Sequence, residues 1–337
     1  MRRLVVICLL AVVAVLFYSC ERRPFSQNNT AVNFKLNINT EINTGSKLDM
    51  PDMMRVDLFD ITTGNVVYTD YISPKGGYIY PRPGKYDLLV YNIDTESTII
   101  KNEDNIGTVE AYTNEISAYL KSQIEQFLKN RAEHYQKART KAPLTKDPIL
   151  EGTERIVNEP DHLWVGEHKG IEIPAFEIGM DNEINLEVDA HTIVENWKIK
   201  ISPVQGLKWV SSITALITGQ TASTYIGQNV DSDGVVTILF PMGKDEENGI
   251  ILGSFNTFGK NPLYSSWLSL DINIIDNIGD EHHFHFDLTD QFFENNEFTL
   301  VVDNEKNPIV IEEPKVAGGG FSPTVSDWNE IKTEIHL

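Results

Sequence analysis

Three histidines lie close together near the end of the chain, in the sequence His282-His283-Phe284-His285. Alternate side chains of a strand share a face, so His283 and His285 would point the same way and could hold a metal ion through neutral imidazoles. Three acids are near enough in sequence to add oxygen ligands: Asp276, Asp280 and Glu281. The chain has no second His or Cys group with metal-ligand spacing, and histidines are ordinary on exposed strands. We expect no metal and no cofactor, with a site at His283 and His285 as the alternative.

A second acidic motif, Asp231-Ser-Asp-Gly234, begins like a calcium loop. It has no bidentate Glu at the offset that such a loop requires, so it is read as a hairpin turn. The chain also contains no G-x-S-x-G, H-E-x-x-H, P-loop or dinucleotide fingerprint. Its other carboxylates are too dispersed for a catalytic pair to be selected. We therefore expect a protein that is not an enzyme.

The chain has two cysteines, Cys8 and Cys20, and both belong to its N-terminal segment. Met1-Arg2-Arg3 is basic, and Leu4 to Tyr18 is an apolar run of 15 residues that ends at Ser19-Cys20. A helix of that length reaches about 22 Å, whereas a hydrocarbon core is about 30 Å thick. A charged start, a short apolar run and a small residue before the break are typical of a secretory signal.

This segment resembles a bacterial lipoprotein signal, which is removed in front of an acylated cysteine. By that resemblance residues 1–19 are the signal peptide, Cys20 carries the lipid, and residues 20–30 are a polar tether. A bacterial lipoprotein carries three acyl chains, and more than one chain is needed for stable attachment to a membrane. The alternative is an ordinary signal peptide with an incidental cysteine.

The mature chain would be strongly acidic. The signal removes 19 of 337 residues and two of the 28 basic residues, which leaves 318 residues with 26 basic against 49 acidic side chains, a net charge of −23. Such a surface argues against nucleic acid as a partner. With Cys8 removed and Cys20 acylated, the folded part has no disulfide, so its stability must come from packing.

Residues 31–110 have the pattern of a β-sandwich. Apolar and polar residues alternate in Ala31–Asn39 and Met54–Phe59, and Val66–Ile72 follows a Thr-Gly-Asn turn. Pro83-Gly84 is strong turn chemistry, and a strand with Tyr86, Leu88 and Val90 on one side comes directly after it. Short strands with closely spaced turns favour an N-terminal β-sandwich.

Residues 111–160 are predicted to form a helical connector. Ala111 to Lys141 lacks Pro and Gly, and its apolar residues have helical spacing, with Thr113 or Asn114 as the N-cap. The segment is also rich in Lys and Arg. We expect an amphipathic helix at the domain junction that packs one face on a sandwich and leaves its basic side chains in solvent; a helix that binds a membrane surface or a partner is the alternative.

Residues 161–337 return to short alternating segments and predict a C-terminal β-sandwich. The clearest candidate strands are 183–189, 197–201, 235–240, 250–258, 267–274, 283–288 and 298–302. The fold class is therefore mainly β.

Several segments together resemble a family of Bacteroidales outer-membrane lipoproteins of unknown function, grouped with fimbrillins and fimbrial-anchor lipoproteins. They are Cys20-Glu-Arg-Arg, Pro83-Gly-Lys-Tyr86 with the following Tyr91-Asn-Ile-Asp-Thr-Glu96, Phe255-Asn-Thr-Phe258, and the C-terminal stretch from Val316 to Leu337. The resemblance implies two transthyretin-like β-sandwich domains, a lipid-anchored and surface-exposed location on the outer membrane, and a role as anchor or accessory subunit of a fimbria.

Fimbriae of this kind join subunits by adding a strand from one subunit to the sheet of another. The last residues have the alternation of such a strand behind a flexible Gly318–Gly320 hinge: Ile331, Thr333, Ile335 and Leu337. Either this strand pairs within its own domain, or it is donated to a neighbouring fimbrial subunit.

A surface glycan-binding lipoprotein is the alternative function. Exposed aromatic rings would stack on sugars, and the candidates are Trp164, Trp197, Trp209, Trp267 and Trp328. The alternation around Trp197 and Trp267 favours positions in the core instead.

Overall fold

The computed structural model describes residues 29–138, 153–177, 182–261, 268–294, 298–305 and 308–314 of the chain. Over these ranges the protein is mainly β, as predicted. The strands are β1 (Ala31–Ile38), β2 (Met54–Asp60), β3 (Val66–Ile72), β4 (Gly77–Ile79), β5 (Gly84–Asn92), β6 (Thr98–Lys101), β7 (Glu110–Thr113), β8 (Ile156–Asn158), β9 (Trp164–Ile173), β10 (Glu183–Thr192), β11 (Glu195–Ser202), β12 (Val204–Gln205), β13 (Val210–Thr221), β14 (Ser223–Tyr225), β15 (Val230–Asp231), β16 (Val235–Asp245), β17 (Ile250–Thr257), β18 (Ser269–Asp276), β19 (Glu281–Asp287), β20 (Thr299–Asp303) and β21 (Ile309–Val310). The helices are α2 (Ala118–Gln123), α3 (Glu125–Ala138), α5 (Thr289–Glu294) and the 3-10 turn η2 (Leu207–Trp209).

The first large sheet has seven strands in the order β3-β2-β5-β9-β10-β1-β4. Its apolar side chains form one core cluster, to which strands along the whole sheet contribute, including Val32, Met54 and Val188. The edge strands β3 and β4 approach each other, so the sheet is curled around this core. β1 runs parallel to β10, with Ala31 opposite Glu183 and Ile38 opposite Ala190.

β5 is buried on both faces, which explains why consecutive residues of this strand are apolar and do not alternate with polar ones. Leu88 and Val90 belong to the core inside the curled sheet, whereas Leu89 and Tyr91 belong to a separate cluster on the outer side. The strand begins at Gly84, as the turn chemistry predicts, and the Tyr86 hydroxyl donates to the Arg82 carbonyl at 3.0 Å.

The second large sheet has the order β19-β18-β13-β16-β17-β11-β20, with β8 added to β16. Its core cluster includes side chains from most of these strands and from Leu288 and Phe292 at α5. Ile309 and Ile311 join the same core, and β21 pairs with β12 as a small separate sheet. The strands predicted in this half of the sequence are therefore confirmed within the described ranges.

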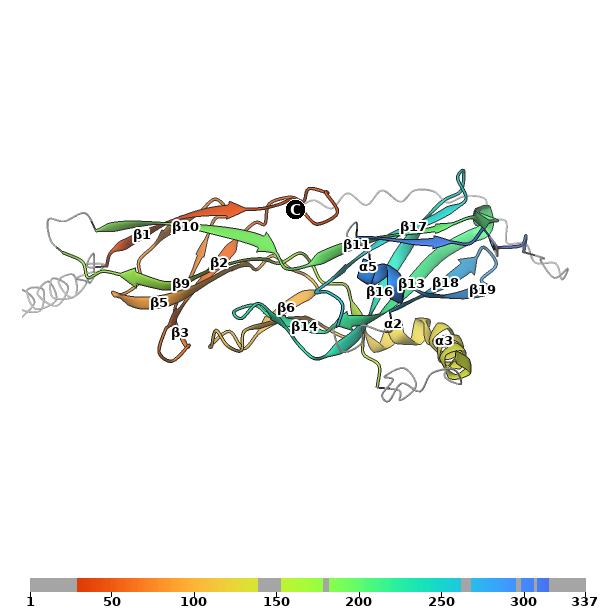
Figure 1. Cartoon of the computed structure of the whole chain (residues 1–337), viewed down its shortest axis with the longest axis horizontal. Helices are drawn as coiled ribbons and strands as arrows, with labels where there is room; N and C mark the ends of the chain where they lie inside the picture. Colours follow the sequence, from red (N-terminus) through yellow and green to blue (C-terminus); the bar gives the residue numbers. More distant parts are fainter. Residues whose placement is uncertain are drawn as a thin grey trace, which may run out of the picture.

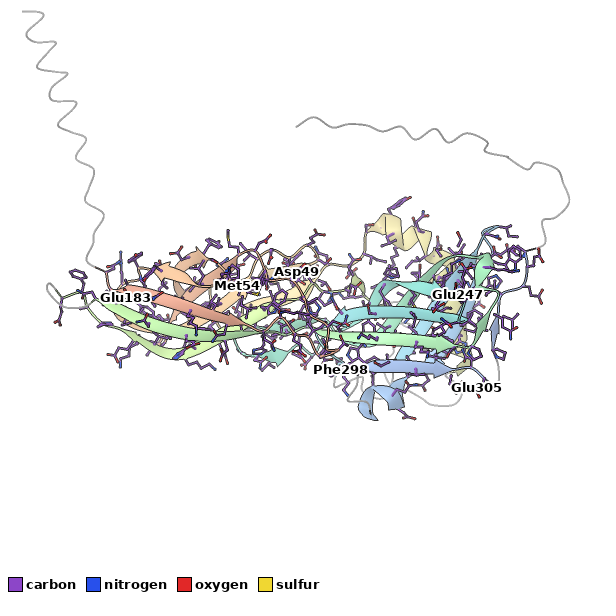
Figure 2. The ribbon with its side chains drawn as sticks, turned by 90° about the horizontal axis from the view of Figure 1, so that it is seen from above. Asp49, Met54, Glu183, Glu247, Phe298 and Glu305 are labelled. Atoms are coloured by element: carbon purple, nitrogen blue, oxygen red, sulfur yellow. The ribbon has the colours of Figure 1, made fainter. Side chains whose placement is uncertain are left out.

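The two large sheets lie end to end along the long axis of the molecule (Figure 1). Only Ile193 and Val194 separate β10, in the first sheet, from β11, in the second. Glu183 lies at one end of the molecule and Glu305 at the other (Figure 2). Since β9 and β10 pair with β5 and β1, the boundary expected near residue 161 does not coincide with a boundary between sheets.

A four-stranded sheet, in the order β15-β14-β7-β6, covers the outer face of β5. Val109 just before β7, Ala111 in β7 and Ile226 after β14 pack there against Leu89 and Tyr91. The Asp231-Ser-Asp-Gly234 segment connects β15 in this sheet to β16 in the second large sheet. Its prediction as a hairpin turn was therefore wrong, because the two strands it joins do not pair.

The helical segment is shorter than predicted at its start. Ala111 and Thr113 lie in β7, because pairing with β6 and β14 outweighs their local preference. The Ser117 hydroxyl, rather than Thr113 or Asn114, caps α2 by accepting from the Leu120 amide at 3.1 Å. Ile124 then interrupts the helix, with φ at −106°. The two helices lie against the second large sheet, away from the connection between β10 and β11 (Figure 1). None of the helices in the described ranges has the length and apolar character needed to span a bilayer.

Candidate functional site

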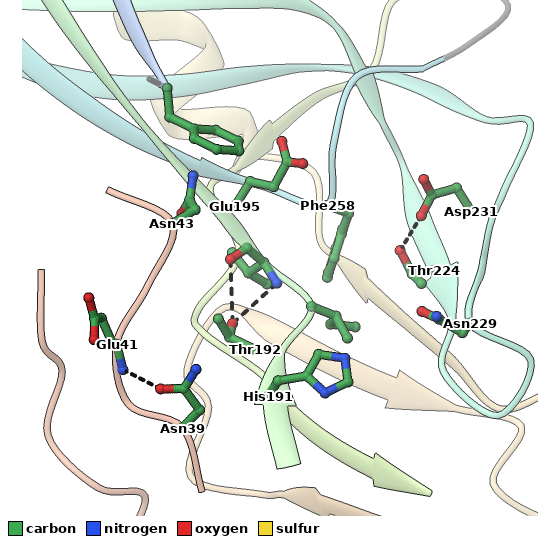
Figure 3. Close-up of a pocket in the computed structure, with 13 residues that line it drawn as sticks. Asn39, Glu41, Asn43, His191, Thr192, Glu195, Thr224, Asn229, Asp231 and Phe258 are labelled. Carbon is green, nitrogen blue, oxygen red and sulfur yellow. Dashed lines mark hydrogen bonds between the residues drawn. The ribbon is translucent and has the colours of Figure 1, made fainter. Parts of the chain in front are cut away.

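A polar cleft of about 460 Å³ lies where the two large sheets meet, and we call it the waist cleft (Figure 3). Three segments line it: the loop after β1, the β10–β11 connection, and the β14–β15 hairpin. Its lining residues are Asn39, Glu41, Asn43, His191, Thr192, Ile193, Val194, Glu195, Thr224, Asn229, Asp231, Phe258 and Phe298. The composition is rich in carboxamides, carboxylates and hydroxyls, which suits hydrogen bonding to a polar ligand.

Hydrogen bonds fix the walls of the waist cleft. Asn43 Nδ2 donates to the Asn196 carbonyl at 2.8 Å, and the Asn196 amide donates to Asn43 Oδ1 at 2.9 Å. The Trp164 indole donates to the Asn39 carbonyl at 2.9 Å. The loop after β1 is therefore held against β11 and β9, so the cleft is a preformed feature of the junction.

The waist cleft is acidic. Glu41, Glu195 and Asp231 are its carboxylates, against the single imidazole of His191. Burial raises the pKa of Asp231, while a 2.9 Å hydrogen bond from the Thr224 hydroxyl opposes that rise. Glu195 accepts a hydrogen bond from the Trp197 indole at 3.0 Å. Two of the three acids are therefore already engaged by neighbouring side chains.

Two of the three histidines of β19, His283 and His285, line a second cavity, of about 460 Å³, between α3 and the second large sheet. We call it the α3 pocket, and it is lined by Phe127, Asn130, Arg131, Glu133, His134, Asp271, His283, Phe284 and His285. β18 and β19 pair so that Asp271 faces His285 and Asn273 faces His283. The prediction that His283 and His285 share one strand face is confirmed.

None of the acids considered as metal ligands lines the α3 pocket, although Glu281 lies beside His283. Asp276 approaches His282 at 3.4 Å and accepts from the Ile278 and Asp280 amides, so it closes the β18–β19 turn. Glu281 approaches His283 at 3.4 Å. Among the residues that the structure describes, no group of three or more His, Cys, Asp or Glu side chains could hold a metal ion.

The α3 pocket also contains a charged network that sequence reasoning missed. Arg131, expected in solvent, is 3% exposed. Its guanidinium donates to Asp271 at 2.7 Å and to both oxygens of Glu154 at 2.6 and 2.7 Å. His285 Nδ1 lies 2.7 Å from the other Asp271 oxygen, and Tyr135 contacts Asp271 at 3.2 Å. These contacts fix α3 to the sheet.

Burial and neighbouring charges set the direction of the pKa shifts in this network. Burial opposes ionisation of Asp271, but the Arg131 charge and the His285 hydrogen bond hold its pKa below the usual value. Burial also lowers the pKa of His283, against the opposing charge of Glu281. The His283 ring stacks on Phe127 with centroids 5.5 Å apart, and the His134 ring lies 4.2 Å from that of His285.

The tryptophans do not form an exposed platform within the described ranges. Trp164 and Trp197 are 6% and 4% exposed and belong to the two large cores, and Trp209 packs partly buried on the second core. The core positions predicted from the alternation around Trp197 are confirmed. Trp267 and Trp328 lie outside the described residues, as do Cys20 and the possible donor strand with Ile331, Thr333, Ile335 and Leu337.

The outer edge of β20 carries a side chain in place of a neighbouring strand. Gln291 Nε2 donates to the Val301 carbonyl at 2.7 Å, and the Val301 amide donates to Gln291 Oε1 at 2.8 Å. β20 otherwise pairs in parallel with β11. In a parallel ladder alternate residues direct both main-chain groups to one side, so Val301 belongs to the row of groups that faces away from β11.

Comparison with known proteins places the chain in a family. Residues 19–241 match the sequence profile of a family described as a domain of unknown function, DUF5119. The match covers more than half of the chain, and the chain belongs to this family. It is also 24% identical over 180 residues to the "Putative fimbrium anchoring subunit Fim4B" of Bacteroides ovatus, an alignment that covers 53% of this chain and 44% of that relative's length.

Solved structures from species of Bacteroides and Porphyromonas resemble the chain. A "putative adhesin" from Bacteroides ovatus is 19% identical, with 88% of this chain and 98% of that chain covered and a TM-score of 0.58. This similarity shows that the two chains share a fold. The fimbrial anchor protein Mfa2 from Porphyromonas gingivalis is 13% identical, with 81% and 89% of the two chains covered and a TM-score of 0.44.

Proposed function

We propose that this protein is a lipid-anchored surface protein of the bacterial outer membrane and serves as an anchor or accessory subunit of a fimbria-like assembly. It acts by binding and not by catalysis. The similarity to a fimbrium anchoring subunit supports the assembly, and the apolar segment before Cys20 supports the lipid.

One geometric observation supports the proposal: Ala31, near the first described residue, and Glu305, in the second large sheet's half of the chain, lie at opposite ends of the molecule. Ala31 is paired with Glu183 at one end, and Glu305 lies at the other end (Figure 2). Nine peptide units separate Cys20 from Asn29, so the tether reaches at most about 32 Å. A lipid on Cys20 would hold the first sheet near the membrane and leave the far end of the second sheet free for a partner.

The finer architecture is part of the proposal. Each large sheet with its core is taken as one transthyretin-like β-sandwich unit, and the division follows sheet membership, so that β9 and β10 belong to the first unit. β21, the last described strand, pairs with β12 beside the second core, and residues 315–337 continue from there. Donation of a strand containing Ile331, Thr333, Ile335 and Leu337 to a neighbouring subunit remains the proposed contact, with pairing inside the same unit as the alternative.

Metabolic labelling tests the anchor. Cells that express the protein are grown with radioactive palmitate, and Cys20→Ala is compared with the unaltered chain. We expect label and outer-membrane fractionation for the unaltered chain and neither for the variant. A chain that reaches the envelope without label contradicts the lipid anchor.

Affinity capture from native envelopes tests the assembly. We expect a tagged chain to recover fimbrial subunits, and a chain that lacks residues 329–337 to lose them while it keeps its circular dichroism spectrum. Loss of the folded spectrum would instead show that the terminal strand belongs to its own unit. Capture that recovers no fimbrial subunit at all would contradict the assembly role.

A further inference from the structure

Another cavity, of about 590 Å³, lies at the end of the first large sheet where β2 and β4 end and β5 begins. We call it the tyrosine pocket, because its lining residues include Asp60, Tyr68, Tyr80, Arg82 and Tyr86. Its volume is within the usual range for small-molecule sites. Neither a lipid on Cys20 nor the addition of a strand makes use of this pocket.

Hydrogen bonds fix the walls of the tyrosine pocket. The Tyr68 hydroxyl accepts from the Tyr80 amide at 3.2 Å, and Asn29 Nδ2 donates to the Tyr80 carbonyl at 2.9 Å. On the other side of the pocket, the Tyr86 hydroxyl donates to the Arg82 carbonyl at 3.0 Å. Both main-chain groups of Tyr80 are therefore held, and the pocket is formed before any ligand arrives.

Two prolines restrain the segment that carries the exposed part of the pocket, Tyr80-Pro81-Arg82-Pro83. A proline limits the residue before it to extended backbone conformations, and here it follows both Tyr80 and Arg82. Tyr80 is 54% exposed, and Arg82 is exposed beside it. Because the backbone of this segment is already ordered, a ligand that contacts these two side chains pays little to order it.

Polar groups of the tyrosine pocket keep hydrogen-bonding capacity. Asp60 Oδ1 accepts from the Thr62 and Thr63 amides at 3.0 and 2.9 Å, and these bonds hold the pKa of the carboxyl below its usual value. Asp60 Oδ2 accepts no hydrogen bond from any residue that the structure describes. The exposed Arg82 guanidinium likewise has no partner among the described residues. The pocket therefore offers one charged acceptor and one charged donor to a ligand.

These two charges are close enough to act on the same hydroxyl group. Burial raises the pKa of Tyr86, the Asp60 charge adds to that rise, and the Arg82 charge opposes it. A simple anion would be repelled by Asp60 and a simple cation by Arg82. Hydroxyl groups donate to a carboxylate and accept from a guanidinium, so a neutral ligand with several hydroxyls matches both side chains.

Exposed tyrosines continue along β4 away from the pocket. Ile79 is fully buried, so Tyr78 and Tyr80 on either side of it face outward, and they are 51% and 54% exposed. Tyr71, on the neighbouring edge strand β3, is 51% exposed. A tyrosine ring presents an apolar body with a polar tip, which suits the apolar face and hydroxyl rim of a sugar ring. Rings repeated in this way favour a ligand made of several sugar units.

We propose that the tyrosine pocket binds a neutral glycan through one of its sugar units. Asp60 and Arg82 form hydrogen bonds with the hydroxyls of that unit, and the Tyr80 ring packs on its apolar face. Tyr78 contacts the next unit of the same glycan. The site goes beyond the function proposed above, because it depends neither on lipid attachment nor on fimbrial assembly.

Saturation-transfer NMR on the purified protein tests this directly. The probes are four neutral disaccharides, maltose, lactose, mannobiose and diacetylchitobiose, and phosphocholine serves as a comparison that carries a charge of each sign. We expect saturation transfer to at least one disaccharide at millimolar concentration, and tighter binding of that disaccharide than of phosphocholine. Silence from all four disaccharides, or tighter binding of phosphocholine, overturns the proposal.

Two variants localise the binding. Tyr80→Ala removes an exposed ring and Arg82→Gln removes an exposed guanidinium, and each should weaken disaccharide binding by about tenfold. Tyr80→Phe keeps the ring and should retain most of the affinity, which separates packing on the sugar from a role of the hydroxyl. Thermal unfolding checks that the variants fold. If Tyr80→Ala lowers the amount of folded protein, Arg82→Gln decides the result.

The matched control is Tyr119→Ala. Tyr119 is 75% exposed on α2, which packs beside the second large sheet, so its loss removes an exposed tyrosine outside the tyrosine pocket. Tyr119→Ala should leave disaccharide binding unchanged. Equal loss in this control, or no loss in either pocket variant, rules out the tyrosine pocket as the site.

Discussion

Gln291 and Val301 form a pair in which one side-chain amide takes both main-chain hydrogen bonds of a strand residue. The two distances are 2.7 and 2.8 Å, so the carboxamide stands where the backbone of an added strand would stand. Val301 is also 45% exposed on the second large sheet. A strand edge with free main-chain groups can pair with a strand of another chain. At the outer edge of β20, α5 covers these groups with a single residue, Gln291.

Removing that amide should expose the edge. We predict that Gln291→Ala associates with itself at concentrations where the unaltered chain is monomeric, and that it loses about 1 kcal/mol of unfolding free energy with the two hydrogen bonds. Light scattering after size exclusion measures the association.

The control for this change is Gln228→Ala. Gln228 Nε2 also donates to a main-chain carbonyl, that of Gly107, at 2.7 Å, but it lies in a turn and not on a strand edge. Gln228→Ala should lower the unfolding free energy by about as much as Gln291→Ala does, but it should not cause association. Association in both variants, or in neither, would show that Gln291 does not guard the edge.

Arg131 should be among the residues most sensitive to substitution. Arg131→Met leaves the buried Asp271 and the partly buried Glu154 without their cation, and breaking a buried ion pair in this way costs about 3–5 kcal/mol. Urea unfolding followed by tryptophan fluorescence measures the loss. The double variant Arg131→Met/Asp271→Asn should lose less than the two single changes together, because it removes the unpaired charge.

Lys129 on the same helix provides the comparison. Its ion pair with Glu125 spans 2.8 Å, but both side chains are more than 60% exposed. Lys129→Ala should change the unfolding free energy by no more than about 0.5 kcal/mol. Comparable losses for the two variants would mean that α3 does not depend on the buried network.

Stability should fall as the pH drops below 6.5. Burial lowers the pKa of His283 and of His162 below that ordinary value, so near this pH the unfolded imidazoles bind protons that the folded ones do not. Their contribution is fully present above pH 6.5 and is lost as the pH falls toward the folded pKa. Unfolding free energies measured in urea on both sides of pH 6.5 should show this slope, and His283→Leu should reduce it. An unchanged slope in that variant would assign the effect to other groups.

Gly206 should tolerate no side chain. Its φ is +80°, and an added Cβ would lie 1.8 Å from the Ile311 carbonyl oxygen. Gly279 also has positive φ, at +95°, with nothing within 4 Å of an added Cβ. Gly279→Ala should cost about 1–3 kcal/mol through backbone strain alone, and Gly206→Ala clearly more, because β12 and β21 must separate. Thermal unfolding compares them, and equal losses would contradict the close contact.

Much of the fold follows from alternation along single strands. Val32, Phe34 and Leu36 are spaced by two in the sequence and buried together in the first core. The order of strands does not follow in this way, since β1 pairs with β10 across some 150 residues and no local pattern encodes that partner. The first large sheet therefore includes β9 and β10, which follow the domain boundary expected near residue 161.

The candidate sites were only half predictable. His283 and His285 could be placed on one face, because a strand has period two. Arg131 could not be found, because its partners Asp271 and Glu154 lie far away in sequence and a basic residue on an amphipathic helix is usually solvated. A signal was nevertheless present: Arg131 has helical spacing from the apolar residues Phe127 and Leu128 and follows their face.

The parallel pairing of β1 with β10 has a mechanical consequence. β1 begins beside the tether, and β10 continues within two residues into the second sheet. A pull between the tether and the far end would slide these strands past each other along their length. The hydrogen bonds across eight paired residues must then rupture together instead of opening one at a time. The molecule is thus built to resist tension along its long axis, the direction in which shear flow would stretch a chain held at a cell surface in the way proposed above.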